Sequence, residues 1–134
     1  LKQYQEIPFI MDHDAPEFAD VLPGLLNTYA RLNTIFKAKY HALCVLSGNF
    51  SCLLWQKFFD EMEKTLHLPT TLLHPYLRRQ MENLCQDHRS ALSGPLVRND
   101  RQTLQRNIQA LHDDPSQAVY QSFVNYYKRS INHE

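Results

Sequence analysis

The residues best suited to chemistry lie along one stripe of a long apolar segment. At about 100° per residue of an α-helix, the stripe contains Lys37, His41, Cys44, Val45, Gly48 and Cys52. Asn49 lies at the edge of this stripe. In a cleft, His41 could transfer a proton and Asn49 could anchor a substrate by hydrogen bonding. The alternative is structural: Gly48 permits a close helix crossing, while His41 and Asn49 satisfy backbone groups at a bend.

A second candidate is the turn-forming string Ala-Leu-Ser-Gly-Pro-Leu-Val-Arg-Asn-Asp, which ends at Asp100. Its glycine and proline favour a tight turn, and Asn99 is placed to cap a helix whose N-terminus favours anions. Ser93 and Arg98 could therefore bind a carboxylate or a phosphate. Alternatively, Arg98 forms a surface ion pair with Asp87 or Asp100, which would contribute little to stability.

Other common chemistries lack their motifs. No GxGxxG and no phosphate loop occur among only three glycines, so we expect no cofactor to bind to this chain alone. The seven histidines include neither HExxH nor a pair four residues apart, and no two cysteines form CxxC. We therefore predict no metal site.

Composition and charge restrict the class of protein. A chain of 134 residues fits one domain, and 14 basic residues balance 14 acidic ones. We therefore expect no nucleic-acid partner. We also expect no membrane partner, because the apolar stretches are too short to span a bilayer. The three cysteines are an odd number without a disulfide pattern, so reduced, buried thiols in a cytoplasmic protein are expected.

The N-terminal quarter predicts a short extended segment followed by a helix. Residues 7–11 form the best strand candidate. The sequence 14–17 has the pattern of a capping box for a helix whose apolar side chains continue to Tyr29, with a kink or restart at Pro23. Residues 32–36 could form an extended connector. We divide the chain after this connector, into an N-terminal part over residues 1–36 and a helical domain over residues 37–134.

A long apolar segment dominates the rest of the chain. Residues 38–66 contain no proline and carry apolar side chains on more than one face, which is typical of a central buried helix. At 1.5 Å per residue, this helix would be roughly 40 Å long, and a small domain needs a partner to cover it. Further helices are predicted after Pro69, Asp100 and Asp114. With 19 leucines against 10 valines and isoleucines, the fold class is mainly α: about five helices around one long central helix.

Two strings in this sequence resemble those of a known family. Tyr40-His41-Ala42 with Ser47-Gly48-Asn49-Phe50 is similar to a "YHxA…xSNF" segment, and the string ending at Asp100 is similar to "ALTGPxxRGD". Ser93 replaces a threonine there, and Asn99 replaces a glycine. Together they resemble the C-terminal domain DUF2520 of Rossmann-like NAD(P)-dependent oxidoreductases. That family is similar in plan to pyrroline-5-carboxylate reductase and to 6-phosphogluconate dehydrogenase C-terminal domains. The resemblance covers roughly residues 6–128.

The resemblance implies a function as well as a fold. It implies that NAD(P) binds to an N-terminal Rossmann domain outside this chain, that the long helix forms a homodimer, and that a small-molecule substrate lies in a cleft. It nominates His41 as the catalytic residue, and Asn49, Ser93, Arg98 and Ser47 as substrate-binding residues. Ser47 and Asn49 lie about 200° apart on an α-helix, so at most one faces the cleft, and Asn49 is preferred.

We therefore expect the chain to be the dimerisation and substrate half of an oxidoreductase of unknown substrate, inactive without its nucleotide-binding half. The alternative is a stand-alone helical module that dimerises or binds a partner without catalysis.

Overall fold

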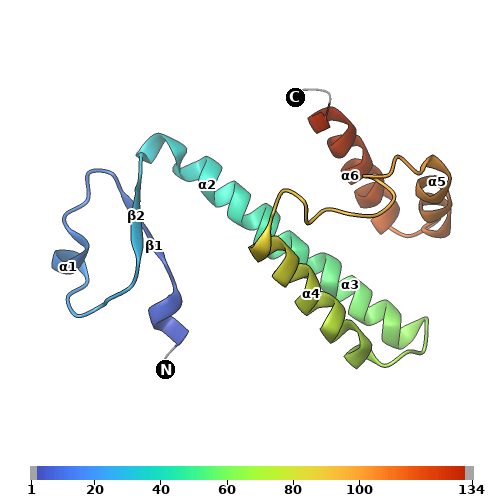
Figure 1. Cartoon of the computed structure of the whole chain (residues 1–134), viewed down its shortest axis with the longest axis horizontal. Coiled ribbons are helices and arrows are strands. Elements are labelled where there is room, and N and C mark those ends of the chain that lie inside the picture. Colours follow the sequence, from blue (N-terminus) through green and yellow to red (C-terminus); the bar gives the residue numbers. More distant parts are fainter. Residues whose placement is uncertain (1–2, 132–134) are drawn as a thin grey trace. The chain divides into compact units, whose positions relative to one another are not determined.

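The computed structural model describes residues 3–131 and is mainly helical (Figure 1), which confirms the predicted fold class. The chain divides between Thr70 and Thr71 into two compact units. The first unit carries a small sheet and the long helix, and the second carries three further helices. Within the described residues, no helix is long and apolar enough to cross a membrane.

The first unit begins with two short parallel strands. A 3₁₀ turn, Gln3–Glu6, precedes β1, Phe9–Asp12, which pairs in parallel with β2, Tyr29–Leu32. The register aligns Phe9 with Tyr29 and Asp12 with Leu32. The predicted strand at residues 7–11 overlaps β1, whereas β2 begins at the last residue of the predicted helix, Tyr29, and was not predicted.

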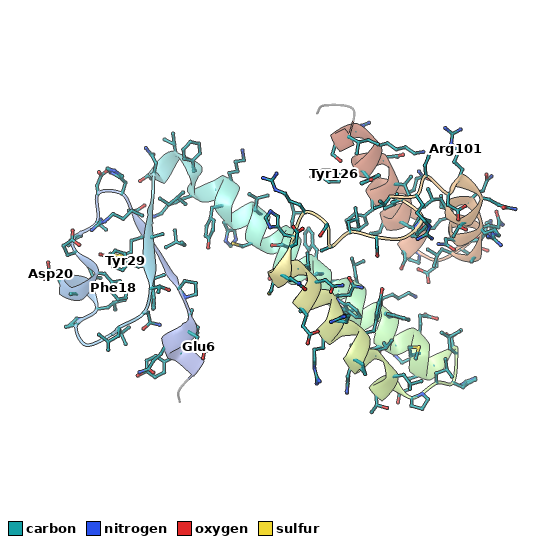
Figure 2. All side chains as sticks on the ribbon, viewed as in Figure 1. Glu6, Phe18, Asp20, Tyr29, Arg101 and Tyr126 are labelled. Atoms are coloured by element: carbon teal, nitrogen blue, oxygen red, sulfur yellow. The ribbon has the colours of Figure 1, made fainter. Side chains whose placement is uncertain are left out.

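The helix predicted to continue to Tyr29 is wrong. Only one helical turn forms, α1, Phe18–Val21, and its N-cap residue Glu17 makes no side-chain capping hydrogen bond. The chain leaves the helix before Pro23, and Gly24 then turns it at a φ of 86°, which glycine adopts at little cost. Phe18 is 4% exposed and packs against Phe9 and Tyr29 at ring-centroid distances of 5.3 and 4.9 Å (Figure 2). The apolar periodicity therefore reflects one aromatic cluster around the buried Phe18.

An arginine on β2 holds the loop between β1 and α1. The Arg31 guanidinium donates to the backbone carbonyls of His13, Ala15 and Pro16 at 3.1, 2.6 and 3.2 Å. It also pairs with the Glu17 carboxylate at 3.0 Å. These bonds fix the segment for which the sequence predicted a capping box.

The long helix follows β2 directly (Figure 1). Asn33 accepts the Ile35 N–H at 3.0 Å and starts a 3₁₀ turn, Thr34–Phe36. Three helical segments then follow without a break: α2, Lys37–Cys44, a π-helical turn, Val45–Asn49, and α3, Phe50–Lys64. The long helix predicted over residues 38–66 is therefore present. Its first residue, Lys37, pairs with Asp12 at the end of β1 at 2.6 Å.

The second unit contains α4, Leu73–Gln86, α5, Arg101–Ala110, and α6, Ser116–Ile131, with a 3₁₀ turn, Thr70–Leu72, just before α4. Asp114 accepts the Ser116 N–H at 2.7 Å at the start of α6, where a cap was predicted. The α5 and α6 helices are joined by a hydrogen bond from Asn107 to the Tyr120 hydroxyl at 3.0 Å. Leu104 and Val124 are the buried apolar side chains of these two helices, and Leu73 is buried on α4.

Candidate functional site

The five residues nominated from the sequence lie in two groups, one in each unit. His41, Ser47 and Asn49 lie on the long helix of the first unit, and Ser93 and Arg98 lie in the loop before α5 in the second. We describe each group within its own unit.

The first group spans the π-helical turn at Val45–Asn49. Here the Phe50 N–H donates to the Val45 carbonyl five residues earlier, instead of four. Such a turn accommodates one extra residue and occurs frequently at functional sites. At Gly48, in the middle of the turn, an added Cβ would meet no atom within 4 Å. The close helix crossing considered for Gly48 is therefore absent from its surroundings in this structure.

The π turn changes which side chains share a face. In an uninterrupted α-helix, the eight steps from His41 to Asn49 would separate the two by about 80°. Because the turn absorbs one residue, the separation falls to about 20°. Ser47 lies near the opposite side of the helix by the same reasoning. These step angles place His41 and Asn49 on a common face of the helix and Ser47 away from it.

Two serines bond to the helix carbonyls around the π turn. The Ser47 hydroxyl donates to the Leu43 carbonyl at 2.7 Å. The Ser51 hydroxyl lies 2.7 Å from the Ser47 carbonyl and 2.8 Å from that of Gly48. His41 and Asn49 are exposed, and their side chains do not take part in these bonds. The structural alternative, in which His41 and Asn49 satisfy the backbone at a bend, is therefore not what the structure shows.

The cysteines are not buried as predicted. Cys44, Cys52 and Cys85 are all free and exposed, so the expectation of buried thiols is wrong. Next to His41, a side-chain hydrogen bond with Cys44 raises the pKa of the Tyr40 phenol.

The second group lies in a loop shaped by two left-handed residues. Gly94 has a φ of 91° and Asn99 a φ of 52°, and asparagine tolerates this conformation better than most residues. Between them, the Arg98 N–H donates to the Gly94 carbonyl at 3.2 Å. Ser93 and Arg98 are both exposed. The replacement of the family's glycine by Asn99 thus keeps the backbone conformation that this position requires.

The cap of α5 differs from the prediction by one residue. Asp100, not Asn99, is the N-cap, and its carboxylate accepts the Thr103 N–H at 3.0 Å. This hydrogen bond lowers the pKa of Asp100, and the positive charge of Arg98 makes a smaller contribution in the same direction. The carboxylate occupies the helix N-terminus that the sequence had offered to an anionic ligand. An anion held by Ser93 and Arg98 would therefore bind in the loop.

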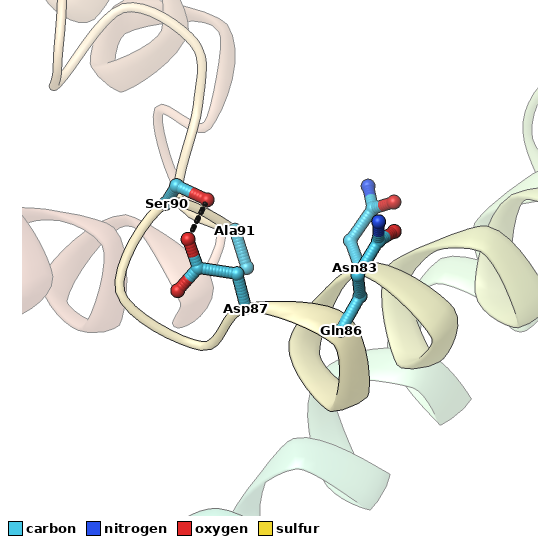
Figure 3. Close-up of a pocket in the computed structure, with 5 residues that line it drawn as sticks. All are labelled: Asn83, Gln86, Asp87, Ser90 and Ala91. Carbon is cyan, nitrogen blue, oxygen red and sulfur yellow. Dashed lines mark hydrogen bonds between the residues drawn. The ribbon is translucent and has the colours of Figure 1, made fainter.

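Arg98 was proposed to pair with Asp87 or Asp100. Among the described residues, it forms a salt bridge with neither of them. Asp87 instead accepts the Ser90 hydroxyl at 2.6 Å and the Arg89 N–H at 3.0 Å (Figure 3). Both bonds favour its charged form and lower the pKa of Asp87. The Arg98 guanidinium thus remains available to a ligand.

A shallow open pocket, missed by the sequence analysis, lies beside this loop in the second unit. Its volume is about 400 Å³, and it is lined by Asn83, Gln86, Asp87, Ser90 and Ala91 (Figure 3). The lining carries amide, hydroxyl and carboxylate groups, which suit a polar ligand. Its polar residues come from the end of α4 and the turn after it, where no spacing motif marks them in the sequence.

Comparison with known proteins identifies the family. The model of the "Domain of unknown function (DUF2520)" matches residues 12–127, and no curated protein matches the chain. The structure is similar to the crystal structure of a putative NADP oxidoreductase from Bacteroides fragilis, with a TM-score of 0.65 and 20% sequence identity. The likeness covers 77% of this chain and 40% of that one, so the chain corresponds to less than half of the longer protein. At this identity, the likeness concerns the fold. The family match covers most of the sequence, and the chain belongs to the DUF2520 family.

Proposed function

We propose that this chain is the dimerisation and substrate half of an NAD(P)-dependent oxidoreductase whose nucleotide-binding Rossmann domain lies outside residues 1–134. The proposal is carried by the π turn at Val45–Asn49, which by its step angles brings the exposed His41 and Asn49 toward one face of the long helix. Family membership and the likeness to the longer Bacteroides protein support it.

His41 and Asn49 would act together on the substrate. The His41 imidazole is exposed, and an imidazole can donate or accept a proton. The Asn49 amide can both donate and accept hydrogen bonds, so it can orient a carbonyl, imine or amine close to His41. A bound nicotinamide would supply the hydride. The chain's own residues hold the substrate and move the proton.

The remaining nominated residues differ in what they could contribute to substrate binding. Arg98 can bind a carboxylate or phosphate of the substrate through its fork of N–H donors, and Ser93 can add one hydroxyl. The Ser47 hydroxyl proton is already donated to the Leu43 carbonyl, so Ser47 could only accept a hydrogen bond. We therefore assign Ser47 the smallest part in substrate binding.

The long helix would form the dimer. Seven of its large apolar side chains are between 37% and 60% exposed in the chain alone: Tyr40, Leu43, Leu46, Phe50, Leu53, Leu54 and Phe58. Complete burial of one such side chain contributes roughly 1.5–3 kcal/mol, so a second copy packed along the helix gains from several of them. The free thiols suit a reducing compartment, and we place the protein in the cytoplasm.

Two measurements test the proposal. Calorimetry should show NADPH binding to the full-length protein and none to the 134-residue chain, because this chain has no phosphate-binding loop. Sedimentation should show a dimer for both. Failure of the full-length protein to bind NADPH or NADH would contradict the oxidoreductase assignment and leave the alternative: a helical interaction module, favoured by the exposed apolar helix alone.

The role of His41 needs its own variants. In the full-length protein, His41→Ala and His41→Gln should retain NADPH affinity and melting temperature, because the ring is exposed and packs no core. Both should lose turnover of NADPH with a panel of small carbonyl and imine compounds. Lys39→Ala, also exposed and two residues away, is the matched control. Equal turnover in His41→Ala and the control would remove His41 from the mechanism.

A further inference from the structure

The strand pair in the first unit is too small to be a complete sheet. Strands β1 and β2 contain four residues each and run parallel. An isolated two-stranded ribbon is at best marginally stable in water, and parallel sheets are nearly always larger and covered on both faces. The structure therefore contains part of a sheet whose remainder is elsewhere.

The outer edges of both strands lack a partner strand among the described residues, and the edge of β1 is defined by its backbone hydrogen bonds. The Phe9 N–H donates to Thr28 and the His13 N–H to Leu32, each at 2.9 Å. Because alternate residues of a strand direct their backbone groups toward opposite neighbours, Ile10 and Asp12 present theirs to the other side of β1. Among the described strands, no third one pairs there, since the sheet has the order β1-β2.

The two faces of the pair are unequal. Phe18 covers the face that carries Phe9 and Tyr29. Side chains alternate between faces along a strand, so Ile10 lies on the opposite face, where it is 41% exposed. On that face, Asp12 is held by Lys37 and Thr34 at the start of the long helix. The apolar part of the second face remains uncovered.

We propose that the open edge of β1 pairs with a strand of the nucleotide-binding domain, so that β1 and β2 complete the sheet of that domain. The inference rests on the proposed function. The occupant follows from topology: neighbouring strands are mostly consecutive in sequence, and the strand that precedes β1 would come from the domain before it. The solved Bacteroides protein is long enough to supply it, since the likeness covers only 40% of that chain. The helical domain then begins at Asn33, and the Asp12–Lys37 pair fastens the His41 helix to the nucleotide-binding sheet.

Amide hydrogen exchange, measured by NMR, tests this pairing. In the 134-residue chain, the Ile10 and Asp12 amides should exchange faster than those of Phe9 and His13, which are hydrogen-bonded. In the full-length protein, Ile10 and Asp12 should slow by at least about tenfold. If both still exchange rapidly in a full-length protein that binds NADPH, the strand pairing is wrong and the proposed function stands.

The other outcomes separate the two proposals. Slow exchange at Ile10 and Asp12 without any NADPH binding supports the strand pairing and contradicts the oxidoreductase assignment. Protection that appears in the 134-residue chain and grows with its concentration identifies a second copy on the edge, which overturns the inference. As a matched pair, Ile10→Lys should lower the melting temperature of the full-length protein more than Ile7→Lys, which lies outside the strand and is 57% exposed. Equal effects of the two substitutions would count against burial of Ile10.

Discussion

Removal of a single hydroxyl from α6 tests whether one hydrogen bond holds the second unit together. Asn107 donates to the Tyr120 hydroxyl at 3.0 Å, and both residues are half-buried. Tyr120→Phe removes the bond and keeps the ring. The net contribution of a neutral hydrogen bond is about 0.5–1.5 kcal/mol. For a unit of this size, each 1 kcal/mol corresponds to roughly 4–8 °C, so we expect its melting temperature to fall by roughly 2–12 °C.

A double-mutant cycle with Asn107→Ala isolates the interaction. Urea denaturation followed by far-ultraviolet circular dichroism should give a coupling free energy of about 0.5–1.5 kcal/mol between the two positions. Tyr126→Phe is the matched control, because Tyr126 lies on the same helix, is 72% exposed and should change stability by less than about 0.5 kcal/mol. A coupling near zero, or equal effects of Tyr120→Phe and Tyr126→Phe, would refute the assignment. The loop that carries Arg98 leads directly into α5, so this packing also supports the position of Arg98 within the second unit.

Three further outcomes are expected. Phe18→Ala should destabilise the first unit by about 3–5 kcal/mol through loss of its buried ring, whereas Phe36→Ala, 50% exposed, should cost far less; thermal denaturation compares the two. The pKa of Asp100 is lowered by its bond to Thr103, so its stabilising effect is complete above the ordinary value of 3.8 and is lost as the pH falls below it. Asp100→Asn should therefore reduce the acid sensitivity of unfolding, and unchanged curves between pH 2 and 6 would contradict this. Deletion of Gly48 should convert the π turn to α-helix, rotate α3 by about 100° and abolish turnover while helix content and NADPH affinity persist; retained turnover would show that the helical phase is irrelevant to the site.

The sequence predicts the long elements of this fold well and the short ones poorly. The helix over residues 37–64 and the start of α6 follow from apolar periodicity and from the cap predicted at Asp114, whereas the cap of α5 lies one residue beyond the predicted Asn99. The strand β2 was missed because its four residues include Arg31, whose bonds to the loop 13–17 depend on distant chain segments. The helix expected before it failed for the same reason. Phe18 and Tyr29 have helical spacing, but they satisfy their apolar surface by stacking across two elements.

The π turn explains why helical periodicity in the sequence assigns the face of His41 but not that of Asn49. A periodic pattern assumes a constant 100° step, and it therefore assigns faces correctly only up to Cys44. Beyond that residue, the extra residue in the turn moves every side chain by about one step, which brings Asn49 onto the face of His41. No residue type compels this turn, since Gly48 is compatible with either helix. The hydroxyls of Ser47 and Ser51 supply bonds to the carbonyls around it. The preference for Asn49 over Ser47, first based on a 200° separation, thus has an independent physical reason: one serine stabilises the bend that presents the asparagine.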